Sequence, residues 1–301
     1  MLRKWIKQLI QQRFSNVRFL FAAPLAYPPG HFYSPICSPA ELKRRYRDPR
    51  TTASPRDLPG IDLAHDAQVR LWESWRPFLE EARGSFLAND PSRRYRVRSA
   101  SYDIGDATIY VCMLRHLRPA RLIEVGSGSS SAVALDTFDQ FFAKRPRASF
   151  IDPYPGFVRS LLTPHDKDTV EIIATGVQDL PPNYFDDLQP NDILFIDSTH
   201  IVKTGSDVVY ELFDVLPRLR SGVVVHFHDV FYPFEYPREW GLVRNYSWNE
   251  LYALRAFLMG NHDWEIMFFN DYFVRTERAR VERDAPEILM NPGGGLWLRR
   301  R

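Results

Sequence analysis

The chain has 301 residues, 45% of them hydrophobic and 25% charged, and its formal net charge is +2 at pH 7. This composition suits one soluble α/β domain with an appendage, and so small a net charge gives no electrostatic reason to expect nucleic acid or an acidic membrane as a partner. No segment approaches the ~20 apolar residues of a membrane span, and the two cysteines, Cys37 and Cys112, form no C-x-x-C pair, so we expect a cytoplasmic protein without a disulfide framework.

The segment Met1–Arg18 has the pattern of a basic, amphipathic helix. Its apolar side chains recur with helical spacing among basic ones: Trp5, Ile6, Leu9, Ile10 and Phe14 with Arg3, Lys4, Lys7 and Arg13. Such a helix either docks on the body of the protein or a partner subunit, or makes weak peripheral contact with a membrane. Because the apolar residues are periodic and not contiguous, we do not expect a cleaved signal peptide.

The segment Pro24–Pro59 is rich in proline, arginine and aromatic residues, which predicts an extended arm. Its first part, Pro24–Tyr46, which includes His31, Phe32 and Tyr33, either folds over the rim of the sheet as a lid, or serves as a packing arm or dimer contact. A homo-oligomer is therefore one of the expectations.

Helical periodicity follows over Ile61–Leu87 and again over Gly105–Leu117. We therefore predict an N-terminal part over residues 1–100, made of a helix, the arm and a further helix. The second predicted domain spans residues 101–301.

From residue 121 onward, short apolar runs alternate with helical patterns. The predicted strands are Arg121–Val125, Ala148–Asp152, Val170–Ala174, Asp192–Asp197, Gly222–His228, Trp264–Asn270 and Gly295–Arg299. The helical segments between them are Ser129–Lys144, Gly156–Leu162, Ser206–Leu219 and Trp248–Met259, with a turn near Leu180–Leu188 and a polar loop over Arg275–Pro292. Strands that are apolar almost throughout indicate a parallel sheet with helices on both faces.

The first of these strands runs into the loop E-x-G-x-G-x-S, which begins at Glu124. Gly126 and Gly128 let the backbone adopt left-handed conformations and let a ligand approach the main chain past Ser127. The acid at the strand end can hold an amino group or a ribose hydroxyl. The loop differs from the dinucleotide motif G-x-G-x-x-G and lacks the lysine of a P-loop. Its acid-first pattern resembles motif I of the class I S-adenosylmethionine (SAM) methyltransferases.

Every predicted strand of the parallel part ends in polar residues, and open α/β sheets bind ligands at that edge. Asp152, after the second strand, can accept hydrogen bonds from both ribose hydroxyls. Gln178 and Asp179, after the third, can bond an adenine amino group. Asp197, after the fourth, can hold the amino group of a methionine moiety or a metal. Together these side chains predict a nucleoside site.

Histidines and aspartates after the fourth and fifth strands allow a metal site as well. Asp197 and Asp229 would suffice for Mg²⁺, and Zn²⁺ or Fe²⁺ would accept His228 as a third ligand. Alternatively, His228 is a general base, because a neutral imidazole can take a proton from a hydroxyl group near pH 7. His200 is a further candidate for that role, while His226, deeper in the strand, is expected to be structural.

Several blocks of the chain resemble a bacterial branch of the class I SAM-dependent methyltransferases, over roughly residues 29–272. They are Pro29–Ile36, the helix with Asp106 and Arg115, Arg121–Ser131, DILFIDSTH (Asp192–His200), GVVVHFHDVFYPFEYP (Gly222–Pro237) and WNELYALRAFL (Trp248–Leu258). The resemblance implies a seven-stranded, mostly parallel sheet with helices on both faces.

The resemblance also implies SAM as the methyl donor, bound by Glu124, Gly126, Gly128, Asp152 and Asp179. Metal-dependent O-methyltransferases of related type place aspartates after the fourth and fifth strands near a divalent ion such as Mg²⁺. The two aspartates at those strand ends of this chain match by position.

The resulting hypothesis is a SAM-dependent methyltransferase that acts on a hydroxyl group of a small molecule, such as a sugar or secondary metabolite. Alignment of the two reactants would supply most of the catalysis, with proton removal by His228 or assistance from a metal, and Asp197 and His200 beside it. The alternatives are a metal-dependent hydroxylase or hydrolase on the same fold, and a nucleoside-binding protein without catalysis.

Overall fold

The computed structural model describes residues 26–48, 57–85, 90, 92–97 and 102–301. The chain divides into two compact units, one formed within residues 1–52 and 238–247 and the other by residues 53–237 and 248–301. The predicted helix over residues 1–18 lies outside the described residues. Within the described residues, no helix has both the length and the apolar character needed to cross a membrane.

The smaller unit contains α2 (Pro39–Arg45) and a π-helical turn, η6 (Glu239–Val243). Ser38 begins α2 with a reciprocal cap: its Oγ accepts from the amide of Glu41 at 3.2 Å, and its own amide donates to the Glu41 carboxylate at 2.7 Å. The described part of the predicted arm before α2 forms turns and bends, in which the rings of His31 and Phe32 stack 4.3 Å apart.

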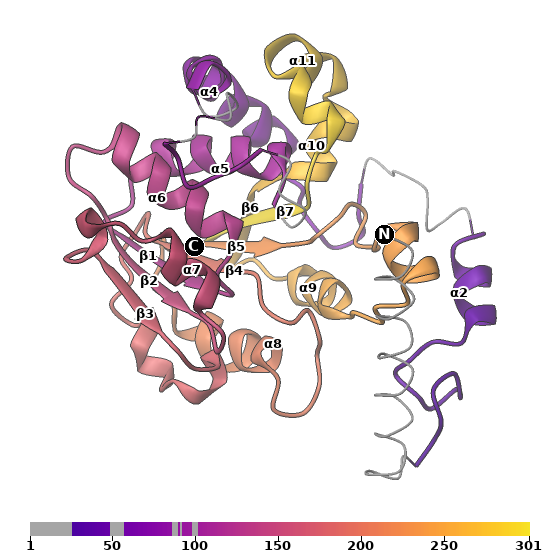
Figure 1. Ribbon diagram of the computed structural model, residues 1–301. Helices are drawn as coiled ribbons and strands as arrows, with labels where there is room; N and C mark the ends of the chain where they lie inside the picture. The colour runs from indigo at the N-terminus through magenta and orange to yellow at the C-terminus, as the bar shows by residue number, and fades with distance from the viewer. Residues whose placement is uncertain (1–25, 49–56, 86–89, 91, 98–101) are drawn as a thin grey trace, which may run out of the picture. The chain divides into compact units, whose positions relative to one another are not determined.

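The larger unit is built on one seven-stranded sheet in the order β3-β2-β1-β4-β5-β7-β6 (Figure 1). Its strands are β1 (Arg121–Val125), β2 (Arg147–Ile151), β3 (Val170–Ile173), β4 (Ile193–Ile196), β5 (Val224–His228), β6 (Trp264–Phe269) and β7 (Gly295–Arg300). Strands β1 to β5 pair in parallel, whereas β7 is antiparallel to both β5 and β6. This order confirms the predicted class I methyltransferase-like sheet.

Helices cover both faces of the sheet, with α4, α5 and α6 on one side and α8 and α9 on the other (Figure 1). The helices are α4 (His65–Ser85), α5 (Ile104–Leu117), α6 (Ser129–Phe141), α7 (Gly156–Leu161), α8 (Asp207–Tyr210), α9 (Glu250–Leu258), α10 (Asn270–Thr276) and α11 (Arg278–Asp284). A π-helical turn (Glu211–Val215) and a 3₁₀ turn (Leu216–Arg218) continue α8, and further 3₁₀ turns span Pro164–Asp166, Val177–Asp179, Pro182–Phe185 and Pro286–Met290.

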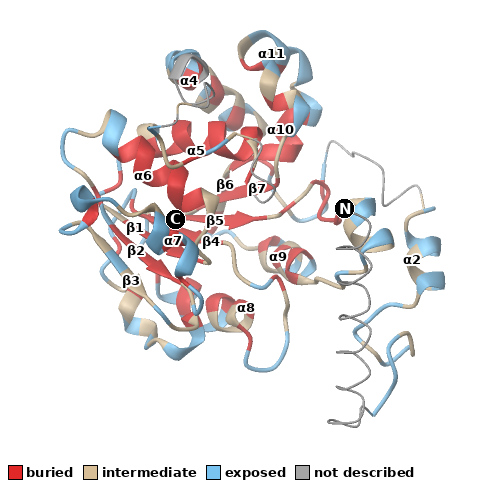
Figure 2. Ribbon diagram, in the orientation of Figure 1, coloured by how far each residue is buried: buried red, intermediate tan, exposed pale blue. Residues whose placement is uncertain are grey.

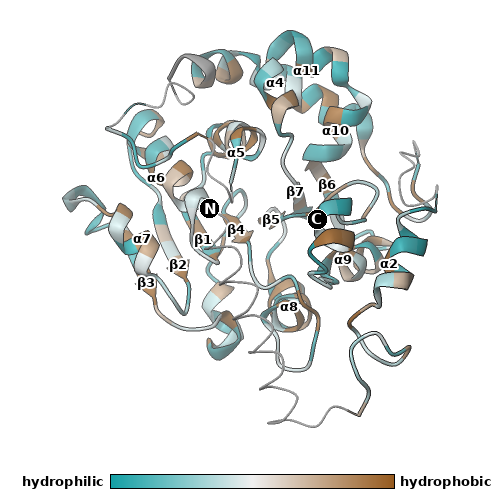
Figure 3. Ribbon diagram, turned by 45° about the vertical axis from the view of Figure 1, so that its right-hand side comes forward, coloured by the Kyte–Doolittle hydropathy of each residue, from teal (hydrophilic) through white to brown (hydrophobic). Residues whose placement is uncertain are grey.

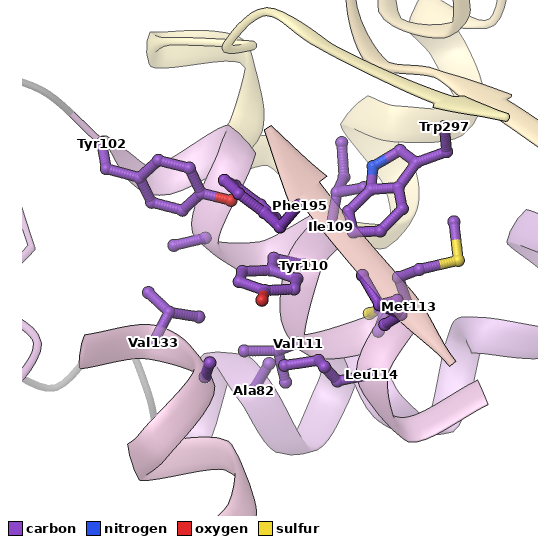
Figure 4. Packing of buried hydrophobic residues seen from close by; sticks show 14 of the residues in the cluster. Ala82, Tyr102, Ile109, Tyr110, Val111, Met113, Leu114, Val133, Phe195 and Trp297 are labelled. Atoms are coloured by element: carbon purple, nitrogen blue, oxygen red, sulfur yellow. The ribbon is translucent and has the colours of Figure 1, made fainter. Parts of the chain in front are cut away.

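The main core lies between the sheet and helices α4 to α6, where Figure 2 shows the strands and α5 buried. Tyr110 of α5 lies at its centre, with ring centroids 4.8 Å from Phe195 and 5.6 Å from Trp297 (Figure 4). Because α5 is buried between the sheet and α4, its apolar residues are not confined to one stripe. By contrast, α11 is mostly hydrophilic (Figure 3).

The prediction of a polar loop over residues 275–292 is wrong, because this segment contains the end of α10, all of α11 and a 3₁₀ turn. Val281, Ala285 and Ile288, spaced four and three residues apart, are fully buried in the core. The indole nitrogen of Trp72 in α4 also donates to the carboxylate of Asp284 at 2.9 Å. Burial of one narrow apolar stripe outweighs the high charge of the segment.

Candidate functional site

The glycine loop after β1 lies against the end of β4, where the strand order reverses. Gly126 has φ +79°, and a Cβ at this residue would lie 1.8 Å from the carbonyl oxygen of Asp197. The glycine is thus required by the backbone of the neighbouring strand exit. A Cβ on Gly128, in contrast, would have no atom within 4 Å, so the loop is open on that side.

Glu124 is fully buried beneath this loop. Its Oε1 accepts hydrogen bonds from the hydroxyl groups of Ser130 and Ser131, both at 2.7 Å, which connects β1 to the first turn of α6. Burial raises the pKa of this carboxyl group to about 8, although the two serines oppose the shift. The sequence predicts that Glu124 binds an amino group or a ribose hydroxyl of a ligand. In the structure, its Oε1 instead accepts hydrogen bonds from the two serines at the start of α6.

The polar residues after β2 and β3 lie at the accessible rim. The Asp152 carboxylate accepts from both the amide and the hydroxyl group of Ser127, at 3.0 and 2.7 Å, and from the amide of Tyr154 at 2.7 Å. Gln178 and Asp179 are exposed in the 3₁₀ turn after β3. Asp152 therefore fixes the glycine loop with one oxygen and remains partly accessible.

Three side chains at the ends of β4 and β5 form a compact group within the part of the chain that the structure describes. One potential ligand atom each from Asp197, His200 and Asp229 lies within 4.8 Å of the other two. His200 Nε2 is 3.4 Å from Asp197 Oδ1 and 3.5 Å from Asp229 Oδ2. Two carboxylates and one imidazole facing a common point are a donor set that suits a divalent cation.

The start of α9 holds the imidazole of His200 in this group. His200 Nδ1 lies 2.8 Å from Glu250 Oε2, and the ring of Trp248 packs 4.5 Å from the imidazole. Burial lowers the pKa of His200, but the carboxylates of Asp197 and Glu250 outweigh it and raise this pKa well above its ordinary value. The imidazole is therefore fixed among carboxylates from three separate segments.

His228, the last residue of β5, is buried beside the same group. Its Nε2 is 3.4 Å from Asp229 Oδ1. Burial lowers the pKa of His228, but the carboxylates of Asp229, Asp197 and Asp106 outweigh this effect and raise the pKa to about 9. The surrounding carboxylates therefore favour the protonated form of this imidazole, and His228 would have to be neutral to act as a general base.

His226 lies deeper in β5, with its ring between those of Phe195 and Trp297 at centroid distances of 4.2 and 4.3 Å. Neither ring nitrogen has a hydrogen-bond partner among the described residues. Burial, with the neighbouring charge of His228, lowers its pKa well below the ordinary value. The ring is therefore neutral and packs as an aromatic core residue.

The sequence reasoning missed two functional candidates, Glu250 and Asp106. Asp106, in the first turn of α5, is buried and accepts from the Asn270 side chain and the Gly294 amide, both at 3.1 Å. Burial raises its pKa to about 7. The signal that could have found Asp106 is an acid in the first turn of a largely apolar helix. Glu250 is part of the block WNELYALRAFL, which resembles the methyltransferases, but its role there was not considered.

The model of a protein family described as a methyltransferase domain matches residues 123–230, from β1 to just beyond β5. A protein of Archaeoglobus fulgidus, described as an uncharacterized protein, is 30% identical over 176 residues, which are 56% of this chain and 76% of that protein. The chain belongs to the methyltransferase-domain family. The matched residues include the glycine loop and all of the strand ends described above.

Solved methyltransferases are similar at low identity. The SAH-bound methyltransferase PaMTH1 of Podospora anserina is 15% identical, with a TM-score of 0.43, and the similarity covers 93% of this chain and 100% of that one. The O-methyltransferase TomG of Streptomyces achromogenes, in complex with SAM, is 14% identical, with a TM-score of 0.42 and coverages of 86% and 98%. At these values, neither similarity bears on the substrate or metal of this chain.

Proposed function

We propose that this chain is a SAM-dependent methyltransferase that transfers a methyl group to a hydroxyl group of a small molecule, such as a sugar or secondary metabolite. One observation carries the proposal: Asp197 belongs to both halves of the site. Its backbone carbonyl lies against Gly126 of the glycine loop, and its carboxylate faces His200. A methyl donor bound at the glycine loop and an acceptor bound at the carboxylates would therefore lie next to each other, with Asp197 contributing to both binding sites.

The donor site would be formed by the rim residues after β1, β2 and β3. Gly128 leaves open space beside the main chain, Asp152 offers carboxylate oxygens at the position suited to ribose hydroxyls, and Gln178 and Asp179 are accessible to an adenine amino group. Glu124 would act indirectly, because it holds α6 against β1 through Ser130 and Ser131. These residues would bind and orient the donor.

The acceptor site would include a divalent cation held by Asp197 and Asp229, with Mg²⁺ as the ion that their oxygens alone favour. When bound, such a cation would lower the pKa of the acceptor hydroxyl group. The donor set fits, since two carboxylates converge with an imidazole within 4.8 Å.

The residues of the chain would align the acceptor oxygen behind the methyl group and take up its proton. In the proposed reaction, the oxygen would form a bond to the methyl carbon of SAM while the carbon–sulfur bond breaks, and S-adenosylhomocysteine would leave. The hydroxyl proton would pass to His228 or His200 in a neutral state. Holding the reactants in line is expected to supply most of the rate enhancement.

The proposal is tested by incubating the protein with SAM and a panel of hydroxylated small molecules and measuring S-adenosylhomocysteine. Formation of S-adenosylhomocysteine together with a methylated product supports it. SAM binding without turnover on any acceptor would favour a nucleoside-binding protein. Failure to bind SAM, together with bound redox-active iron, would favour a metal-dependent hydroxylase.

A further inference from the structure

We propose that His200, not His228, is the nitrogen ligand of the cation site and that Glu250 is the positioning residue that presents it. The inference rests on the cation site of the proposed function and specifies its ligands as Asp197, His200 and Asp229. A site with this composition would prefer a first-row transition ion, such as Mn²⁺, Co²⁺ or Zn²⁺, over Mg²⁺.

The distances around His200 distinguish its two ring nitrogens. Nδ1 is 2.8 Å from the Glu250 carboxylate, which is a normal charge-assisted hydrogen bond. Nε2 lies 3.4 and 3.5 Å from oxygens of Asp197 and Asp229, which is longer than a good hydrogen bond. Ligands that each lie ~2.1 Å from one ion are ~3–3.4 Å apart at the usual angles between them. Nε2 is therefore spaced as a ligand that shares an ion with the two carboxylates.

The hydrogen bond between His200 and Glu250 is of the kind that orients metal-binding histidines in proteins. A carboxylate that accepts a proton from one ring nitrogen fixes the tautomer and leaves the lone pair of the other nitrogen for the metal. Glu250 is buried and is the first residue of α9, so its own position is set by the helix. The contact gives the site an orienting residue about 50 positions away in the sequence.

The residues at the start of α9 also hold the backbone of His200 in place. Its φ is +60°, in the left-handed region that a residue with a Cβ adopts at a cost. Its carbonyl accepts hydrogen bonds from the amides of Asn249 and Glu250 at 3.1 and 3.2 Å. The Asn249 side chain also accepts from the amide of Val202 at 2.6 Å. The start of α9 thus sets both the backbone and the ring of His200.

His228 lies beside a different oxygen of Asp229 than His200 does. Asp229 directs Oδ2 toward His200 and Oδ1 toward His228, whose Nε2 is 3.4 Å away. His228 is also absent from the group of mutually close ligand atoms in the described chain. It therefore supports Asp229 from outside the group and remains available for proton transfer.

The test is titration calorimetry of the full chain with Mn²⁺ and with Mg²⁺, in the absence of SAM. We expect tighter binding of Mn²⁺. His200→Ala and Glu250→Gln should each weaken Mn²⁺ binding by about 10–100-fold and Mg²⁺ binding by less. Two controls are matched: Glu211→Gln alters another buried acid, which contacts Ser198 and not the imidazole, and His228→Ala removes the other histidine. Both should keep Mn²⁺ affinity within a few-fold.

A second measurement needs no variant. In the Co²⁺-loaded protein, proton NMR should show one exchangeable, strongly shifted N–H signal, from the Nδ1 proton of a histidine bound through Nε2. Two such signals, none at all, or loss of Mn²⁺ binding in His228→Ala with retention in His200→Ala would overturn the assignment. Absence of cation binding in a protein that binds SAM and transfers methyl groups would also overturn it while leaving the proposed function intact. Failure to bind SAM would reject the proposed function instead.

Discussion

The carbonyl oxygen of Asp197 lies 1.8 Å from the point where a side chain on residue 126 would begin. The glycine loop and the end of β4 are therefore packed backbone against backbone. No residue other than glycine fits at this position without moving one of the two strand ends.

Gly126→Val should destabilise the protein, whereas Gly128→Ala should not. The first change meets the Asp197 carbonyl and a φ of +79°, and the backbone strain alone is of order 1–3 kcal/mol. The second faces open space at an extended φ. Thermal unfolding should separate the two variants, and calorimetry should show weaker SAM binding by the stable Gly128→Ala protein. Normal SAM binding by that variant would place the donor elsewhere.

Asp152→Ala should weaken SAM binding by about 1–3 kcal/mol, the usual cost of losing a charged hydrogen-bonding partner. Part of that loss could arise from the glycine loop, because Asp152 also accepts two hydrogen bonds from Ser127. Ser127→Ala, which removes the hydroxyl bond alone, is the control. Equal losses in the two variants would show that Asp152 only holds the loop.

His228→Ala should lower turnover by roughly 10²–10⁴-fold with little change in SAM affinity, as expected for loss of a proton acceptor. His226→Leu should keep both turnover and stability, because neither nitrogen of that buried ring has a partner among the described residues. Steady-state kinetics and thermal unfolding decide. Loss of turnover in a stable His226→Leu protein would reverse the two roles.

Chelation with EDTA should abolish methyl transfer, and added divalent ion should restore it, if Asp197 and Asp229 hold a catalytic cation. The matched control is SAM binding, which uses other side chains and should survive the same treatment. Unchanged turnover after complete chelation would leave the histidines to act alone.

Stability should fall in acid through Asp166, which lies between two arginines. Its oxygens are 2.9 Å from Arg94 and 2.7 Å from Arg145. Burial raises the pKa of Asp166, but hydrogen bonds from Thr163 and the arginines outweigh it, so this pKa is lowered. A lowered folded-state pKa stabilises the fold above the unfolded-state value of 3.8, and this stabilisation disappears as pH falls through the folded value.

The measurement is the unfolding temperature of the native protein and of Asp166→Asn between pH 7 and pH 2.5. The native protein should lose stability more steeply below pH 4. The variant should be less stable at pH 7 and should change less in acid. Parallel curves would show that the carboxylate does not titrate differently on folding.

The sheet could be predicted because its strands are short, buried apolar runs that end in polar residues. Parallel pairing of neighbouring strands then brings Asp197 and Asp229 to the same edge. The same reasoning could not orient His200, since its ring direction depends on Glu250 at the start of a helix that follows much later. Nor could it place Glu124, whose carboxylate turns toward serines that the sequence pattern assigned to the loop and helix start.

The position of β7 has a consequence for the order of folding during synthesis. Strand β6 pairs with no strand other than β7 within the described residues, and β7 also completes the free side of β5. On the ribosome, β6 would therefore emerge without a pairing partner and wait until residues 295–300 have left the exit tunnel. Until then β5, with its histidines, would form an open edge of a five-stranded intermediate, and exposed edges are where chains associate wrongly.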